Sequence, residues 1–147
     1  MNSKYIDKKH PFDWQLEHKL FLDGTKDKFS WILQTGDQVK KEFRIHPPAY
    51  YSGYKLDVKN DEQSKFIALH VGLYWGIGVF IIKDGDIVDV MCDSKKMYDI
   101  MNSKRETADP IINDKIHFAN LFIEQRKLIV NYHLIDSDKN PASELIR

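Results

Sequence analysis

The sequence predicts a mainly β or β-rich α+β fold: an antiparallel barrel or sandwich of about eight or nine strands, with one helix near residues 93–105. Three observations support this prediction. Apolar residues recur mostly at every second position, turn-forming residues separate the apolar runs at short intervals, and only one stretch has clear helical spacing. The 147 residues, 42% of them hydrophobic, suffice for one domain spanning 1–147. We expect loose ends at about 1–10 and 137–147.

The first third of the chain predicts three strands. Apolar side chains occupy alternate positions in residues 12–22, 29–33 and 39–45, as in strands buried on one face. Asp23-Gly24 and Thr35-Gly36-Asp37 separate these runs and favour turns. Two prolines end the third run.

The middle of the chain predicts four more strands, at residues 54–58, 65–74, 77–83 and 87–92. Residues 66–82 carry no formal charge. This run of 17 residues has about the minimum length of a membrane span. The run contains His70 and three glycines, so we interpret it as two buried strands and expect no membrane association. Asp84-Gly85 predicts a tight hairpin turn into the last of these strands.

Residues 93–105 have helical spacing. Asp93 or Ser94 can cap the helix, and Met97, Ile100 and Met101 share one face. Two further apolar runs, 116–123 and 128–135, predict the final pair of strands.

Composition excludes several classes of protein. The 22 basic residues balance the 22 acidic ones, so the net charge is zero. Nucleic-acid-binding proteins usually carry an excess of basic residues, and we therefore do not expect a nucleic-acid partner. The single cysteine forms no intrachain disulfide, and the N-terminus has no secretory pattern. We therefore expect a cytoplasmic protein, without a cofactor.

The most suggestive surface is a proline-stiffened, tyrosine-rich loop with flanking positive charge. Tyrosine offers a large contact area at little cost in side-chain entropy, and such residues are enriched at binding surfaces. The candidate binding residues are Arg44, His46, Tyr50, Tyr51, Tyr54 and Lys55. The competing interpretation is an ordinary connecting loop whose tyrosines pack on the domain.

Cys92 is a weak candidate nucleophile, because it lies at the expected junction of a strand and a helix N-terminus, where a thiolate is stabilised. It also shares a strand face with Val88 and Val90, which favours a core position. The six histidines show no close metal-binding pair, and we predict no metal site. The four aspartates between 84 and 93 do not follow a calcium-loop pattern.

Three functions remain open from the sequence. The first is a non-catalytic binding module that recognises a partner protein, of an inhibitor, immunity or host-interaction type, through an edge strand or the tyrosine loop. The second is a β-barrel that holds a small apolar or anionic ligand in a pocket lined by Trp14, Trp31 and Trp75. The third is a small enzyme that uses Cys92 or a His/Asp cluster. A homodimer through a sheet edge is a further alternative.

Overall fold

The computed structural model describes residues 14–47 and 57–147. Its elements, in chain order, are β1 (Glu17–Gly24), β2 (Lys28–Thr35), β3 (Gln38–Ile45), α1 (Asp61–Gly78), β4 (Ile87–Cys92), α2 (Lys95–Ser103), α3 (Pro110–Gln125), β5 (Ile129–Leu134) and the short 3-10 helices η3 (Ser137–Lys139) and η4 (Pro141–Leu145).

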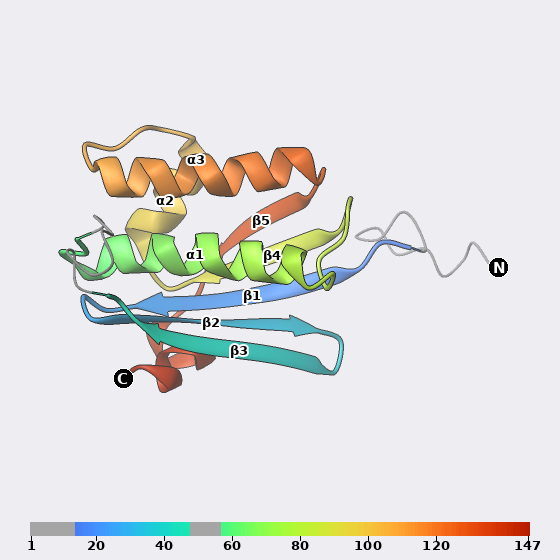
Figure 1. The fold of residues 1–147 in the computed structure, drawn as a ribbon, viewed down its shortest axis with the longest axis horizontal. Coiled ribbons are helices and arrows are strands. Elements are labelled where there is room, and N and C mark those ends of the chain that lie inside the picture. Colours follow the sequence, from blue (N-terminus) through green and yellow to red (C-terminus); the bar gives the residue numbers. More distant parts are fainter. Residues whose placement is uncertain (1–13, 48–56) are drawn as a thin grey trace.

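One mixed sheet organises these elements (Figure 1). Its strand order is β3-β2-β1-β4-β5. β1, β2 and β3 pair antiparallel, whereas β1, β4 and β5 run parallel. The predicted antiparallel barrel or sandwich of eight or nine strands is therefore wrong. In the described part of the chain the sheet has five strands and stays open, with β3 and β5 at its edges.

Three strands, β1, β2 and β3, occupy the first third of the chain as predicted, although Asp23 and Gly24 belong to β1 and not to the turn after it. Short turns join β1 to β2 and β2 to β3, and Gly36 takes a positive φ of 58° in the second turn. The predicted strand at 87–92 is β4, and the predicted strand at 128–135 contains β5. Of the predicted strand at 54–58, residues 54–56 lie outside the described residues, and Asp57 and Val58 are not in a strand.

The two strands predicted at 65–74 and 77–83 are wrong, because most of this run forms α1. Asn60 caps the helix by accepting a hydrogen bond from the Gln63 amide. The helix packs on β1 and β2 and also against α3, so it is apolar on more than one side. A helix in that environment lacks the continuous polar face by which a surface helix is recognised in a sequence. Gly85 has the expected positive φ of 81°. The element before it is α1, however, so the turn does not connect two strands of a hairpin.

The strand predicted at 116–123 is also wrong, because these residues belong to α3. Asp109 accepts hydrogen bonds from the amides of Ile111 and Ile112, and Pro110 occupies the first helical turn. α3 lies alongside α1, and both helices cover one face of the sheet (Figure 1). Among the helices of the described residues, none combines the length and apolar character that a membrane crossing requires.

The core lies between the sheet and α1. Leu20, Leu22 and Trp31 meet Phe66 and Leu73 there, all essentially inaccessible to solvent. Trp75 packs on Trp31, with ring centroids 4.9 Å apart, whereas Trp14 is 60% exposed. The three tryptophans therefore line no common pocket, and the proposed ligand-binding barrel has no structural basis.

The segment after β5, expected to be loose from residue 137, is ordered against the sheet. Ala142 and Ile146 are buried, and the Ser30 hydroxyl donates to the Ala142 carbonyl over 2.7 Å. Ser30 alternates with Trp31 on β2, so η4 docks on the face of the sheet opposite α1. Figure 1 shows the C-terminal end of the chain beside the carboxyl end of β1.

Candidate functional site

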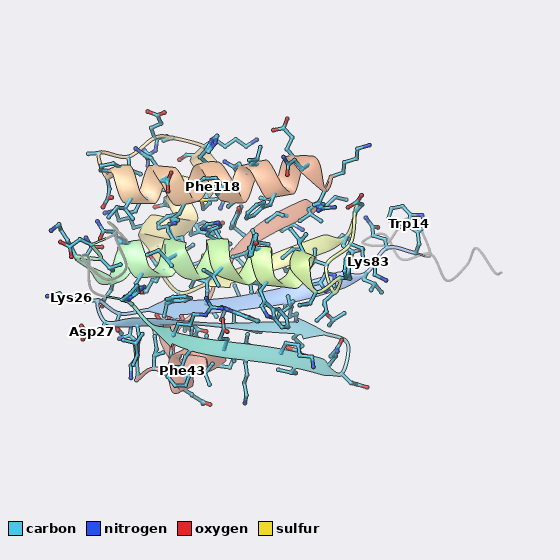
Figure 2. The ribbon with its side chains drawn as sticks, in the orientation of Figure 1. Trp14, Lys26, Asp27, Phe43, Lys83 and Phe118 are labelled. Carbon is cyan, nitrogen blue, oxygen red and sulfur yellow. The ribbon has the colours of Figure 1, made fainter. Side chains whose placement is uncertain are left out.

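The carboxyl ends of β1 and β4 each place an aspartate at the same edge of the sheet. Asp23 is the next-to-last residue of β1, and Asp93 directly follows β4. Because β1 and β4 are adjacent and parallel, these two ends lie side by side. This edge is where ligands of sheets with parallel strands usually bind. Lys26 and Asp27, labelled in Figure 2, mark the β1–β2 turn at this end of the molecule.

Gly24 lets the start of α1 approach the end of β1. A Cβ atom at Gly24 would lie only 2.5–2.6 Å from Ser64, including its backbone carbonyl carbon. The close approach brings Lys65 to the strand end. Its Nζ lies 3.2 Å from Oδ1 of Asp93 and 3.8 Å from Oδ1 of Asp23.

Glu62, in the first turn of α1, adds a third carboxylate. The Ser94 hydroxyl lies 2.7 and 2.9 Å from its two oxygens. Ser94 also caps α2 by accepting from the Met97 amide. Asp23, Glu62 and Asp93, which we call the acidic cluster, therefore come from three elements and are joined through Lys65 and Ser94.

The C-terminal segment completes the surroundings of the acidic cluster. Ser143 donates to Oδ2 of Asp23 over 2.7 Å, and Arg147 contacts both oxygens of Asp23, over 2.8 and 3.2 Å. The Asn140 amide donates to Oδ2 of Asp93 over 3.0 Å and to the Leu22 carbonyl over 2.8 Å. The last ten residues thus contribute three polar side chains to the site.

Asp23 remains a carboxylate although it is fully buried. Burial acts to raise its pKa, but hydrogen bonds from Arg147, Ser143 and the Gly24 amide, together with the charge of Arg147, outweigh burial and hold the pKa below its ordinary value. The hydrogen bond to Asp23 in turn raises the pKa of Arg147. The site combines three carboxylates with two cationic side chains.

Carboxylate oxygens are the ligands that Mg²⁺ and other hard cations prefer, and such ions are common partners of carboxylates in phosphoryl transfer. The arrangement here does not fit a metal ion. The oxygens of Asp23 and Asp93 already accept from Lys65, Arg147, Ser143 and Asn140. Over residues 14–47 and 57–147 we find no group of three or more histidine, cysteine or acidic side chains placed to hold a metal.

A cavity of about 960 Å³ lies between the start of α1, α2 and the α2–α3 connection, and Gln63, which follows Glu62 of the acidic cluster, is among its lining residues. We call it the basic groove because its cationic residues are Lys59, Lys95, Lys96 and Arg105. Asp99, Glu106 and Asp109 dilute this charge. Gln63, adjacent to Glu62, forms part of the wall and donates to Asp109 over 2.8 Å.

The candidate binding loop is only partly described. Tyr50, Tyr51, Tyr54 and Lys55 lie outside the described residues. Arg44 pairs with Glu42 over 2.9 Å on β3. His46 lies 2.7 Å from the Ser64 hydroxyl and packs on Phe29, and burial lowers its pKa. Arg44 and His46 line one small cavity of about 200 Å³.

Cys92 is in the core. Its thiol is fully buried and donates to the His133 carbonyl over 3.4 Å, not to an imidazole. Burial, reinforced by the Asp93 charge, raises the pKa of Cys92 to about 12, so the thiol stays protonated near neutral pH. The histidine–aspartate pairs are separate: His18 contacts Asp86 in the interior, and His133 contacts Asp89 across β4 and β5.

Sequence reasoning missed the acidic cluster. It assigned Asp23 to a turn and Asp93 to a helix cap, and it placed Ser143 and Arg147 in a loose tail. The available signal was an aspartate followed by a small residue after each of two apolar strands, in Asp23-Gly24 and Asp93-Ser94.

The solved structures that this chain resembles include RNase H domains. The RNase H1 of the halophilic archaeon Halobacterium salinarum NRC-1 superposes with a TM-score of 0.67 at 14% identity, over 88% of this chain and 93% of that one. The N-terminal RNase H domain of Rv2228c from Mycobacterium tuberculosis gives 0.66 at 15% identity, over 89% and 91%. LC11-RNase H1, in complex with an RNA/DNA hybrid, gives 0.56 at 12% identity, over 89% and 93%.

No protein-family model matches the sequence, and no curated protein is similar enough to count as a match. The structural neighbours nevertheless correct two expectations. The interpretation as a non-catalytic module that recognises a partner protein is wrong, because the matched structures are RNase H domains. The argument from neutral charge against nucleic acid also fails, because a protein of this fold is solved with an RNA/DNA hybrid. The mixed five-stranded sheet with its three helices is an RNase H-like fold.

Proposed function

We propose that this chain acts on nucleic acid, as a nuclease of the RNase H type whose substrate is a duplex containing an RNA strand. The observation that carries the proposal is the acidic cluster: Asp23, Glu62 and Asp93 meet at the carboxyl ends of two parallel strands and the start of α1. This cluster lies in a fold shared with RNase H1 domains, one of them bound to an RNA/DNA hybrid.

The basic groove supports the choice of substrate. Lys95 and Lys96 begin α2, two and three residues after Asp93, and Lys95 pairs with Asp99 over 2.9 Å. Lys59 and Arg105 extend the same wall. Four cationic side chains along one groove suit a phosphate backbone, which supplies most of the affinity in nucleic-acid binding. In this proposal the groove holds the backbone and the carboxylates lie at the reacting phosphodiester.

A location in the cytoplasm is part of the proposal. The lone cysteine, which is buried and free, is compatible with a reducing compartment.

Binding and cleavage of labelled duplexes test the proposed function. Wild-type protein, Asp93→Asn and Lys83→Ala are incubated with an RNA/DNA hybrid, a DNA duplex of the same sequence, or single-stranded DNA, with and without a divalent cation. We expect hybrid binding by all three proteins, and cleavage of the RNA strand that Asp93→Asn reduces at least 100-fold. Lys83 is the control, because it lies at the opposite end of the molecule (Figure 2). Absence of hybrid binding by wild type would contradict the proposal.

A further inference from the structure

The Lys65 ammonium lies between two buried carboxylates. Its Nζ is 3.2 Å from Asp93 and 3.8 Å from Asp23. The side chains of Asp23 and Asp93 are 0% and 4% exposed, and that of Lys65 is 13% exposed. Because these side chains are largely shielded from water, the attraction between the Lys65 ammonium and the two carboxylates is screened less than in a surface ion pair.

The remaining oxygens of these two aspartates also have donors. Arg147, Ser143 and the Gly24 amide donate to Asp23, and Asn140 donates to the second oxygen of Asp93. A divalent cation needs several oxygens at roughly 2.0–2.6 Å, with their lone pairs free. Such an ion between Asp23 and Asp93 would have to displace the Lys65 ammonium.

Charge balance leads to the same conclusion. The three carboxylates of the acidic cluster face the two cations Lys65 and Arg147, which leaves a formal charge of about −1. Removal of Lys65 alone would leave a charge of about −2 in a site whose two aspartates are closed to water. A single divalent cation would neutralise that charge with the oxygens that Lys65 releases.

We propose that Lys65 is an internal counter-cation that takes the place of a divalent metal ion between Asp23 and Asp93, and so keeps Mg²⁺ and Mn²⁺ out of this site. The inference deepens the proposed function and rests on it for the identity of the site: in wild type the ammonium of Lys65, and not a divalent cation, lies between the two aspartates.

Manganese binding to the purified protein, without nucleic acid, tests this inference. Electron paramagnetic resonance of free Mn²⁺ is measured for wild type, Lys65→Ala, Lys65→Gln and the distant control Lys83→Ala. We expect one Mn²⁺ to bind Lys65→Ala at least tenfold more tightly than it binds wild type or the control. A second substitution, Asp93→Asn, made in Lys65→Ala should abolish the gain.

Lys65→Gln keeps the inference testable if Lys65→Ala does not fold. It retains most of the side-chain length and loses only the charge, and its Mn²⁺ affinity should also exceed that of wild type. In thermal unfolding, Mn²⁺ should raise the Tm of the Lys65 variants and leave wild type unchanged.

Two results would overturn the inference: Mn²⁺ binding by wild type as tight as binding by the Lys65 variants, or no gain in either variant. Hybrid binding is measured separately. A chain that gains Mn²⁺ affinity without Lys65 but never binds a hybrid would disprove the proposed function and leave the role of Lys65 standing.

Discussion

At the scale of single residues, Asp23 concentrates more interactions than any other carboxylate described above. It is fully buried and accepts from Arg147, Ser143 and the Gly24 amide. A buried charge of this kind is tolerable only while its hydrogen bonds are made, and loss of one donor leaves a desolvated carboxylate partly unpaired.

Arg147→Ala should lower the free energy of unfolding by about 1–3 kcal/mol at pH 7, because it removes the charged donor to Asp23. The folded-state pKa of Asp23 lies below 3.8, so its stabilising contribution is complete well above pH 3.8 and is lost as the pH falls through the folded pKa. The wild-type and variant curves should therefore converge in acid. Urea unfolding from pH 7 down to pH 2 measures this.

Lys139→Ala is the matched control, because Lys139 forms only an exposed pair with Asp136 in the same segment. We expect a change of less than about 0.5 kcal/mol. A constant difference between Arg147→Ala and wild type at all pH values would show that the contact acts by packing and not by charge.

His70 shows the opposite behaviour, since burial keeps it neutral. It stacks between α1 and α3 on Phe118 and Phe122, with ring centroids 5.3 and 5.5 Å apart. Figure 2 labels Phe118 on α3. Burial, assisted by the charge of Lys115, lowers the pKa of His70 to about 4. Below pH 6.5 the unfolded chain takes up a proton that the folded chain refuses.

Between pH 6.5 and pH 4, protonation of His70 in the unfolded chain should lower the free energy of unfolding of wild type by about 2–3 kcal/mol. In His70→Phe this decrease should be absent, so the free energy of unfolding should fall less with decreasing pH. The phenylalanine keeps the stacking and removes the titration. Thermal or urea unfolding across this range provides the measurement. His117→Phe, on the exposed side of α3, should retain the wild-type slope. Identical slopes for wild type and His70→Phe would contradict the prediction.

At the scale of elements, the sequence predicted the strands correctly where their local pattern was clear. β2 and β3 alternate apolar and polar residues over most of their length, although β2 is buried on both faces and β3 is an exposed edge strand, and β4 is a short β-branched run after a turn. α1 was interpreted as strands because Phe66, Leu69 and Leu73 lie among further apolar residues that contact the sheet or α3. A helix enclosed on several sides has no polar face to reveal its 3.6-residue period.

Because α1 was predicted as strands, the acidic cluster was not predicted either. If residues 65–74 and 77–83 are strands, as predicted, no helical crossover connects β3 to β4, and nothing implies that β1 and β4 are parallel neighbours. Asp23 and Asp93 then have no reason to meet. The contacts of Ser143 and Arg147 with Asp23 span 120 and 124 residues, and no local pattern predicts such contacts.

Gly24→Ala should destabilise the fold by about 1–3 kcal/mol, because the new Cβ would overlap Ser64 where β1 meets α1. Gly78→Ala is the control, since a Cβ there meets nothing within 4 Å. This control should be neutral or stabilising by up to about 1 kcal/mol. Chemical denaturation of both variants decides the matter, and equal stability of the two would refute the close approach.

At the scale of the whole molecule, net charge proved a poor guide to partners. The 22 basic and 22 acidic residues cancel in total, yet Lys59, Lys95, Lys96 and Arg105 gather along one groove. Local charge within about one Debye length, roughly 10 Å, governs contact with a phosphate backbone. The global balance therefore limits the size of the basic surface and does not exclude it.

Hybrid binding should weaken with salt, with a slope of log K against log salt between about −2 and −4, since four basic side chains line the groove. Lys96→Ala and Arg105→Ala should each make the slope less negative by about one. Fluorescence anisotropy over a salt series gives the slopes, with Lys83→Ala as the control at the far end. An unchanged slope in both groove variants would place the duplex elsewhere.

The docking of η4 and Arg147 on Asp23 also has a consequence for the order of folding. The β1–β3 meander contains only local contacts and can pair early. Its Asp23 carboxylate, however, finds Ser143 and Arg147 only when the last segment arrives. Until then the Asp23 carboxylate lacks these two donors. The sheet and the segment from η4 to Arg147 should thus become stable together.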